Sequence, residues 1–249
     1  MGGALSASML KRGDTLYQTV LNRMRAFPVG RVLDVGTGKG ELAITLAGLG
    51  YSVKACDLEP KAPWPDRDDI EYRQADLNGG IPYPDADFNY VVCLEIIEHI
   101  ENPFAFCREI KRVLAAGGRA IVSTPNILRM RSRIQYLLEG SFPQFDLPLI
   151  EWDQRGGGGY VHVNPIRWHE MEYYMYKAGL EVEDFFSNER SYAWRLLFPL
   201  ELVVRLRAWR KAQRFRKQDR TPVARLYSRI LSDDLLYGTH LIVCVRRPL

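Results

Sequence analysis

Short apolar runs recur along the first half of the chain, and each run ends on a polar or acidic residue. The runs are rich in β-branched and aromatic residues and are too short for typical helices, so we predict buried strands. They occupy residues 32–35, 51–56, 70–75 and 88–94. Apolar residues at helical spacing predict helices over residues 14–26, 41–49 and 102–116. Strands that alternate with helices are typical of an α/β domain with a parallel sheet.

The second half of the chain continues this pattern less regularly. We predict a helix over residues 168–178 and three further strands, over residues 117–124, 180–186 and 240–246. Between them lie two segments without strand periodicity, which leave from the carboxyl ends of the fifth and sixth strands. With 249 residues, the chain has the length of one large domain. We therefore predict a single domain over residues 1–249, with a core at 30–125, 167–187 and 240–247 and insertions at 126–166 and 188–239.

A glycine-rich turn follows the first strand directly, in the sequence Asp34-Val35-Gly36-Thr37-Gly38-Lys39-Gly40. Glycine has no Cβ, so the chain can take strained angles here and a ligand can approach the backbone closely. This pattern is typical of a nucleotide-cofactor loop. A plain strand-to-helix turn is the alternative, because one short motif is weak support by itself.

Acidic residues stand at the ends of the next strands. Asp57 follows the second run, Asp76 the third and Glu95 the fourth. Ligands of open α/β sheets bind outside the carboxyl ends of the strands, and an acid about 20 residues beyond the glycine turn grips ribose hydroxyls. These residues are therefore predicted to meet at a cofactor site.

Together, the four motifs within residues 30–125 resemble the class I S-adenosylmethionine (SAM)-dependent methyltransferases. The resemblance implies a Rossmann-like, seven-stranded α/β sheet with helices on both faces and a last strand that runs antiparallel. It also implies that the glycine turn wraps the amino-acid part of SAM, Asp57 holds the ribose, Asp76 frames the adenine and Leu94 lines the methionine part. The full implied cofactor set is Asp34, Gly36, Thr37, Gly38, Gly40, Asp57, Leu58, Asp76, Leu77 and Leu94.

A dinucleotide-dependent dehydrogenase is the competing interpretation of these motifs. Such an enzyme would prefer G-x-G-x-x-G, whereas the third glycine here, Gly40, comes one position early. The sequence also contains nothing that resembles a second pyrophosphate-binding half. SAM is therefore the predicted cofactor.

The sequence Glu95-Ile96-Ile97-Glu98-His99 carries the second chemical hypothesis. In a helix, positions i, i+3 and i+4 share one face, so Glu95, Glu98 and His99 would project together. Two carboxylates and an imidazole can hold a divalent ion such as Mg²⁺ or Mn²⁺ and leave positions open for substrate. The alternative is that the acids only offset a positive helix end while the histidine makes a hydrogen bond.

An E-x-x-E-H segment in this position resembles ubiquinone-pathway O-methyltransferases and small-RNA 2′-O-methyltransferases. In those families a later histidine completes the set, and His162 takes that place here. The resemblance implies metal ligands Glu95, Glu98, His99 and His162, and catalytic roles for His99, His162 and Glu95. The small-RNA enzymes carry a second consecutive histidine where this chain has Ile100, so a nucleic-acid substrate is not favoured.

These residues favour methyl transfer to a hydroxyl oxygen, because that acceptor needs help to lose its proton. A bound ion or a neutral imidazole supplies this help, and nitrogen or carbon acceptors need neither. Residues 124–126 and 131–140 also resemble methyltransferases of bacterial cell-surface glycans. The expected acceptor is a small molecule, a glycan or a lipid-linked compound. A non-catalytic SAM-binding or membrane-surface scaffold protein and an RNA O-methyltransferase are the alternatives.

The insertion at residues 194–229 is strongly basic. Eleven Lys or Arg residues stand between Arg195 and Arg229, against only Glu201 and Asp219, and they alternate with leucine, valine and tryptophan. This pattern predicts a helix that lies on an anionic membrane surface; a solvated basic face and an RNA-binding surface are the alternatives.

No apolar run is long enough to span a bilayer. Neither a secretory signal nor a C-x-x-C pair is visible, so we predict a cytoplasmic protein with reduced cysteines that can be peripheral to the inner face of the membrane. The run Gly156–Gly159 is a candidate hinge for a lid over the site.

Overall fold

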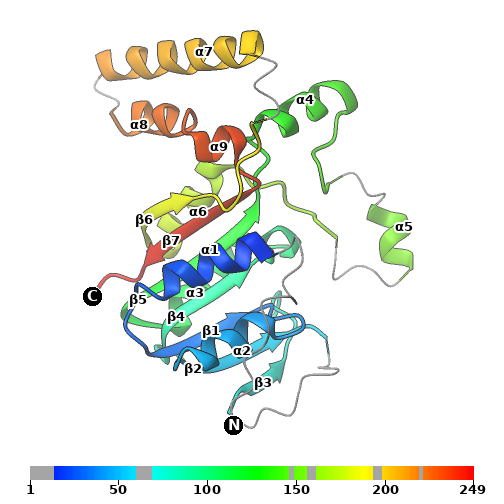
Figure 1. The fold of residues 1–249 in the computed structure, drawn as a ribbon, viewed down its shortest axis with the longest axis vertical. Helices are drawn as coiled ribbons and strands as arrows, with labels where there is room; N and C mark the ends of the chain where they lie inside the picture. Colours follow the sequence, from blue (N-terminus) through cyan, green and yellow to red (C-terminus); the bar gives the residue numbers. More distant parts are fainter. Residues whose placement is uncertain (1–13, 60–68, 146–148, 156–160, 193–197, 219–220) are drawn as a thin grey trace.

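The computed structural model describes residues 14–59, 69–145, 149–155, 161–192, 198–218 and 221–249. The hinge hypothesis for Gly156–Gly159 and residues 194–197 of the basic insertion lie outside these ranges. The described chain is built around one seven-stranded sheet (Figure 1). Its strands are β1 (Arg31–Val35), β2 (Ser52–Asp57), β3 (Glu71–Gln74), β4 (Phe88–Leu94), β5 (Leu114–Pro125), β6 (Glu181–Phe186) and β7 (His240–Arg246).

The strand order is β3-β2-β1-β4-β5-β7-β6. Strands β1 to β5 are parallel, whereas β7 pairs antiparallel with both β5 and β6. This arrangement confirms the Rossmann-like sheet with an antiparallel last strand. The order reverses direction at β1, where β2 and β4 flank it, and that is where a crevice opens above a sheet of this type.

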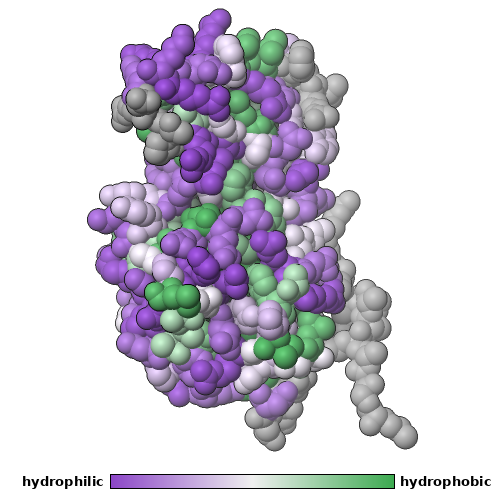
Figure 2. Space-filling view, turned by 90° about the vertical axis from the view of Figure 1, so that its left-hand side faces the viewer, coloured by the Kyte–Doolittle hydropathy of each residue, from purple (hydrophilic) through white to green (hydrophobic). Residues whose placement is uncertain are grey.

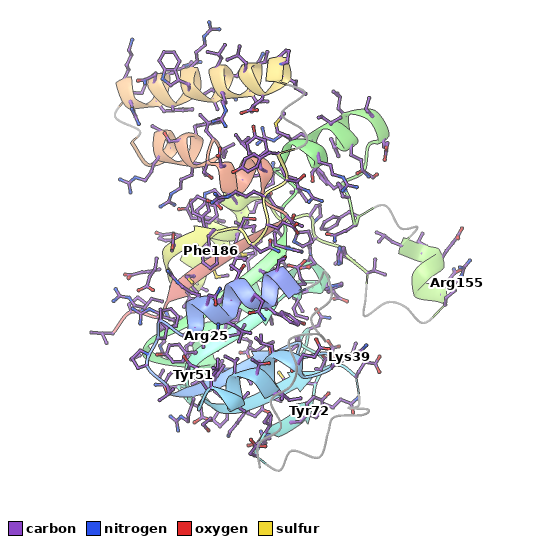
Figure 3. All side chains as sticks on the ribbon, viewed as in Figure 1. Arg25, Lys39, Tyr51, Tyr72, Arg155 and Phe186 are labelled. Atoms are coloured by element: carbon purple, nitrogen blue, oxygen red, sulfur yellow. The ribbon has the colours of Figure 1, made fainter. Side chains whose placement is uncertain are left out.

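The register brings the carboxyl ends of the central strands level with one another. Val35 of β1 pairs with Cys56 of β2 on one side and with Cys93 of β4 on the other. The residues that come next, Gly36, Asp57 and Leu94, therefore meet at the same edge of the sheet. Figure 3 places Lys39, which follows β1, and Tyr51, which precedes β2, at opposite edges.

Helices cover both faces of the sheet, and two apolar cores result. On one face α1 (Asp14–Met24) and α2 (Glu41–Gly48) pack against side chains such as Val32 and Val92. On the other face α3 (Pro103–Val113) and α6 (Trp168–Ala178) pack against the alternate residues of the same strands. Successive strand residues point to opposite faces, so the central strands β1 and β4 supply apolar residues to both cores.

The insertions contain helices that the sequence pattern left undivided. They form α4 (Met130–Glu139), α5 (Leu149–Gln154), α7 (Phe198–Lys217), α8 (Thr221–Arg229) and α9 (Asp233–Tyr237). Figure 1 shows α4, α7, α8 and α9 grouped at one end of the molecule, beyond the β6 edge of the sheet, with α5 standing apart. Both insertions leave from the carboxyl ends of their strands, as predicted. The division into a core and two insertions remains our proposal for the domain organisation.

One buried side chain joins this helical group to the sheet. Asn126, directly after β5, donates from Nδ2 towards the carbonyl oxygens of Leu235 at 3.2 Å and Gly238 at 2.9 Å. Its Oδ1 accepts from the backbone N–H of Leu128 at 3.0 Å. The position where α4 begins is thus fixed to α9 by a buried amide whose polar groups are satisfied.

Candidate active site

A cavity of about 1070 Å³ opens at the carboxyl edge of the sheet. Its lining comes from the ends of β1, β2, β3 and β4 and from the first insertion. It includes most of the predicted cofactor residues, and one predicted catalytic histidine, His99, also lines it. The predicted residues on its wall are Gly36, Gly38, Asp57, Leu58, Asp76, Leu77, Leu94, Glu95 and His99.

The glycine turn combines a close approach to the Ile96 side chain with a backbone angle that residues with a side chain rarely adopt. Gly36 has a φ of +73°, and a Cβ built there would lie 2.0 Å from Cδ1 of Ile96. Its N–H donates to the carbonyl oxygen of Cys56 at 2.8 Å, which ties the turn to β2. Gly40 also has a positive φ, +76°, and begins α2. Both angles are costly for residues that carry a side chain.

Three of the predicted cofactor residues, Asp34, Thr37 and Gly40, lie behind the turn and not on the cavity wall. Thr37 Oγ1 donates to Asp34 Oδ2 at 2.7 Å, and both side chains are buried. Burial raises the pKa of Asp34 to about 7, while the hydrogen bond from Thr37 acts in the opposite direction. The bonded pair of Asp34 and Thr37 supports the turn from inside.

The acids after β2 and β3 face the open part of the cavity. Asp57 accepts from the N–H of Gly38 at 2.7 Å and from the N–H of Glu59 at 3.2 Å. Asp76 accepts from the N–H of Asn78 at 2.9 Å. These backbone bonds orient the two carboxylates, and both side chains line the cavity where ribose and adenine are expected.

The segment after β4 differs from its prediction in one respect. Only a 3₁₀ turn forms, η1 (Ile97–His99), and Glu95 precedes it with a φ of +56°. The shared helical face predicted for Glu95, Glu98 and His99 is therefore wrong. A positive φ is uncommon for a residue with a side chain and marks a backbone that its surroundings hold in place.

Glu95 is directed towards β5 and β7. Its Oε1 accepts from Ser123 Oγ at 2.7 Å, and its Oε2 lies 3.3 Å from Nε2 of His240. Burial raises the pKa of Glu95 to about 7 and lowers the pKa of His240 to about 4. At neutral pH the contact therefore joins a neutral imidazole to a carboxyl group close to its midpoint, and is not a fixed ion pair.

Glu98, His99 and His162 come together although His162 is distant in sequence. One possible ligand atom from each lies within 4.8 Å of the others. His99 Nδ1 lies 3.0 Å from the carbonyl oxygen of Val161, so it carries the proton and leaves Nε2 free. Within the described part of the chain, neither carboxylate oxygen of Glu98 nor Nδ1 of His162 has a hydrogen-bond partner.

Burial governs the charge of this cluster. It raises the pKa of Glu98 well above its usual range, and the nearby carboxyl of Glu95 adds to the effect. It lowers the pKa of His99 and, together with the neighbouring His99, that of His162. At neutral pH both imidazoles are therefore neutral, and each can accept a proton or coordinate a cation.

Several residues at the site were not identified from the sequence. Ile96 closes the glycine turn, Val161 orients His99, and Ser123 and His240 hold Glu95. A signal existed for Ser123 and His240, because β5 and β7 are adjacent in the expected sheet and place these residues near the end of β4. Nothing in the sequence indicated Val161 or Ile96.

Comparisons with known proteins identify the family. The family model described as "Methyltransferase domain" matches residues 9–184. A ubiquinone biosynthesis O-methyltransferase of Xylella fastidiosa is 30% identical over 172 residues, which cover 66% of this chain and 66% of that protein. The protein of the same description from Thiobacillus denitrificans is 29% identical over 185 residues, or 72% of this chain and 73% of that protein.

Solved structures agree on the fold. An S-adenosylmethionine-dependent methyltransferase from Mesorhizobium loti has a TM-score of 0.54 and 18% identity, covering 91% of this chain and 96% of that one. The [4+2]-cyclase SpnF has a TM-score of 0.56 and 18% identity, and the match covers 95% of this chain and 81% of that one. With its glycine turn, its strand-end acids and a family match over residues 9–184, the chain belongs to the class I SAM-dependent methyltransferases.

Proposed function

We propose that this chain transfers the methyl group of SAM to a hydroxyl oxygen of a small-molecule, glycan or lipid-linked acceptor. The observation that carries the proposal is His99, which lines the cavity and donates from Nδ1 to Val161. Its Nε2 is consequently an acceptor beside the space in which SAM would present its methyl group. The ubiquinone O-methyltransferases among the relatives support an oxygen acceptor.

The reaction needs alignment and the removal of one proton. The sulfonium of SAM already makes the methyl group electrophilic, so the protein has to hold the attacking oxygen opposite the sulfur. His99 accepts the hydroxyl proton at Nε2, and the carbonyl of Val161 stabilises the imidazolium that forms. The burial that lowers the pKa of His99 keeps the ring neutral, and therefore basic, before each turnover.

As an alternative to proton transfer to His99, the residues Glu98, His99 and His162 fit a divalent ion, Mg²⁺ or Mn²⁺, with Nε2 of His99 as a ligand instead of a base. The buried carboxylate of Glu98 and Nδ1 of His162 have no hydrogen-bond partner among the residues described, which suits groups that coordinate a cation. Two imidazoles beside one carboxylate are a mixed donor set and match Mg²⁺ less well than a transition ion. When bound, the ion would lower the pKa of the acceptor hydroxyl. The carboxyl group of Glu95 is held by Ser123 and His240, so Glu95 would act beside these three ligands and not as one of them.

The test is a methyl-transfer assay with labelled SAM across diphenols, glycans and lipid extracts, with and without added Mn²⁺. We expect His99→Asn to lower kcat by roughly 10²- to 10⁴-fold, the usual contribution of a general base. Binding of S-adenosylhomocysteine, measured by calorimetry, should stay within about twofold, because His99 lies outside the implied cofactor set. His169→Asn is the matched control, since His169 is on α6 and does not line the cavity.

The alternatives predict different results. A non-catalytic SAM-binding or scaffold protein would bind S-adenosylhomocysteine and methylate nothing in any of these extracts. With RNA added to the same set of acceptors, an RNA O-methyltransferase would label RNA in preference to diphenols and glycans. Unchanged turnover in His99→Asn and Glu98→Gln together would contradict the assignment of the site while leaving the fold and the cofactor untouched.

We also propose that α7 binds an anionic membrane surface, where a lipid-linked acceptor would be found. Its buried side faces α8 and α9, while apolar residues remain on its outer side: Leu202 is 42% exposed, Leu206 43% and Trp209 54%. Figure 2 shows hydrophilic and hydrophobic residues together at this end of the molecule. Basic residues surround them, Arg207 and Arg210 among others. Apolar and basic groups on one helix face suit the boundary between lipid headgroups and chains. No helix in the described ranges is long and apolar enough to cross a bilayer.

Sedimentation with vesicles tests this surface. We expect binding to vesicles of phosphatidylglycerol and phosphatidylcholine in equal parts, and much weaker binding to phosphatidylcholine alone. Leu206→Ser with Trp209→Ser should reduce the bound fraction at least tenfold, because each buries apolar area in the headgroup region. Tyr176→Ser, an exposed residue of α6, is the control. Equal binding to both kinds of vesicle would contradict the proposal.

A further inference from the structure

Two short segments that are distant in sequence, one around Glu98 and one around His162, are tied together by hydrogen bonds. The backbone N–H groups of Val163 and Asn164 both donate to the carbonyl oxygen of Glu98, at 2.9 and 3.0 Å. Asn164 also donates from Nδ2 to the carbonyl oxygen of Ile100. Since His162 directly precedes Val163, these bonds fix its backbone beside Glu98.

The same contacts assemble three possible metal ligands without help from an ion. His99 donates from Nδ1 to the carbonyl oxygen of Val161 at 3.0 Å, which leaves its Nε2 free. The ring centroids of His99 and His162 lie 4.6 Å apart, and the Phe145 ring packs on His162 at 5.1 Å. One ligand atom each from Glu98, His99 and His162 lies within 4.8 Å of the others. Groups that are already in position lose little conformational freedom when they bind.

The chemistry of these three groups fits a bound cation. Both carboxylate oxygens of Glu98 and Nδ1 of His162 are buried and have no hydrogen-bond partner among the described residues. A buried polar group without a partner is costly, and coordination to an ion would offset that cost. One carboxylate and two imidazoles are a donor set that proteins use for Zn²⁺ and Fe²⁺, with positions left open for water or substrate.

Glu95, which the sequence motif implied as a fourth ligand, is held by β5 and β7 instead. Its Oε1 accepts from Ser123 Oγ at 2.7 Å, and its backbone N–H donates to the same Oγ at 3.1 Å. Its Oε2 lies 3.3 Å from Nε2 of His240. Both carboxylate oxygens are therefore engaged outside the cluster of Glu98, His99 and His162.

The His240 ring is itself fixed from its far side. Asn188 donates from Nδ2 to Thr15 Oγ1 at 2.9 Å, so its amide oxygen is the atom that faces His240. That oxygen lies 3.1 Å from His240 Nδ1 and also accepts from the backbone N–H of His240 at 3.3 Å. Nδ1 is thus bonded to Asn188, and Nε2 is the ring atom directed at Glu95.

We propose that His240 is a positioning residue that keeps Glu95 out of the metal site. The ion is then held by three ligands, the carboxylate of Glu98 and the imidazoles of His99 and His162. Such a site takes a transition-metal dication in preference to Mg²⁺, because Mg²⁺ prefers oxygen ligands in octahedral geometry whereas imidazole suits the later first-row ions. The inference rests on the proposed function, since it concerns the ion of that site.

The two glutamates of the motif provide a matched test. After dialysis against a chelator, the full chain is titrated with Co²⁺ alone and with Mg²⁺ alone in a calorimeter. We expect Co²⁺ to bind at least about tenfold more tightly than Mg²⁺. Glu98→Gln should weaken Co²⁺ binding by more than roughly tenfold, whereas Glu95→Gln should leave it within about threefold. Equal losses in the two variants, Mg²⁺ affinity equal to that for Co²⁺, or no Co²⁺ binding would overturn the proposal.

The visible absorption spectrum of bound Co²⁺ tests the role of His240, because it depends on the number and geometry of the ligands. His240→Ala should release Glu95 to the ion, change this spectrum and raise the Mg²⁺ affinity several-fold. His240→Ala with Glu95→Gln should lose both effects, and His169→Ala on α6 is the control. If His240→Ala does not fold, Ser123→Ala removes the other partner of Glu95 and should have the same effects. An unchanged spectrum in the variant that folds would overturn the positioning role.

The ion site and the proposed function fail in different ways. Methyl transfer by a chain that binds no ion would remove the three-ligand site and leave proton transfer to His99 in place. Co²⁺ binding that depends on Glu98 but not on Glu95, without methyl transfer to any acceptor, would do the opposite.

Discussion

The part of the cavity that we propose for the cofactor (the cofactor half) and the part that we propose for the acceptor (the acceptor half) are built in different ways. The cofactor half, at the ends of β1, β2 and β3, consists of backbone turns and of carboxylates such as Asp57 that backbone N–H groups orient. The proposed acceptor half, at the end of β4, lies beside titratable side chains brought from distant parts of the chain, the buried Glu98 and the half-buried His162. The first half follows from local sequence, and the second depends on tertiary contacts.

The difference indicates where specificity resides in this fold. A SAM-dependent methyltransferase and a [4+2]-cyclase are both among the structural neighbours, so the shared fold does not by itself determine the reaction. The cofactor half can be common to many such proteins. The acceptor half, with its insertions, is where this chain can be distinctive.

The largest effect is expected at the glycine turn, where the two halves meet. In Gly36→Ala the new Cβ would collide with Ile96 at 2.0 Å in a backbone with a φ of +73°. We expect S-adenosylhomocysteine binding to fall by more than roughly 10³-fold, or the chain to lose several kcal/mol of stability. Gly38→Ala, with a φ of +51° but nothing within 4 Å, should be milder. Calorimetry measures the binding of S-adenosylhomocysteine to both variants, and thermal unfolding measures their stability. Equal losses in Gly36→Ala and Gly38→Ala would contradict the collision with Ile96.

The second effect concerns how the free energy of unfolding depends on pH, through Asp34 behind the glycine turn. Burial raises the pKa of Asp34 from 3.8 to about 7, so between these values the folded chain holds a proton that the unfolded chain has released. The contribution is fully present below pH 3.8 and is lost as pH rises to about 7, at a limiting slope of about 1.4 kcal/mol per pH unit. Urea unfolding of Asp34→Asn, without ligand, should lack this slope. If the free energy of unfolding depended on pH in the same way in Asp34→Asn and in the wild-type chain, Asp34 would not be the source of the slope.

Substitutions in the two halves should affect different kinetic quantities, the affinity for SAM in one half and kcat in the other. Asp57→Asn should weaken SAM binding roughly 10- to 100-fold, the cost of losing one or two charged hydrogen bonds, with a small change in kcat. Glu95→Gln should leave SAM affinity nearly unchanged and lower kcat. Steady-state rates at varied SAM and acceptor concentrations give both values. If Asp57→Asn instead lowered kcat and Glu95→Gln weakened SAM binding, the boundary that we propose between the two halves would be wrong.

The smallest effect is expected far from the cavity. Trp209 is 54% exposed on α7, so Trp209→Ser should change the free energy of unfolding by less than about 0.5 kcal/mol. Chemical denaturation checks this value. A larger loss would mean that α7 contributes to the fold itself and would weaken the distinction between a stable core and an adaptable insertion.

Much of the fold followed from periodicity. The strands β4 and β7 and the helix α6 have the predicted boundaries, and the other strands differ from prediction by a few residues at their ends. Strands buried on both faces are continuous apolar runs, and this makes them recognisable without alignment. The sequence pattern did not divide the insertions into separate helices. The longest of these helices, α7, carries basic residues around much of its circumference and buries only a narrow side.

The sequence by itself predicted the proposed cofactor half of the site, since a glycine turn and strand-end acids need only their own strands to be placed. Tertiary structure alone decided that Glu95 turns towards Ser123 and His240 and that Val161 fixes the proton of His99. The reason is physical: burial and proximity set the protonation and pairing of these groups, and both arise only when segments distant in sequence pack together.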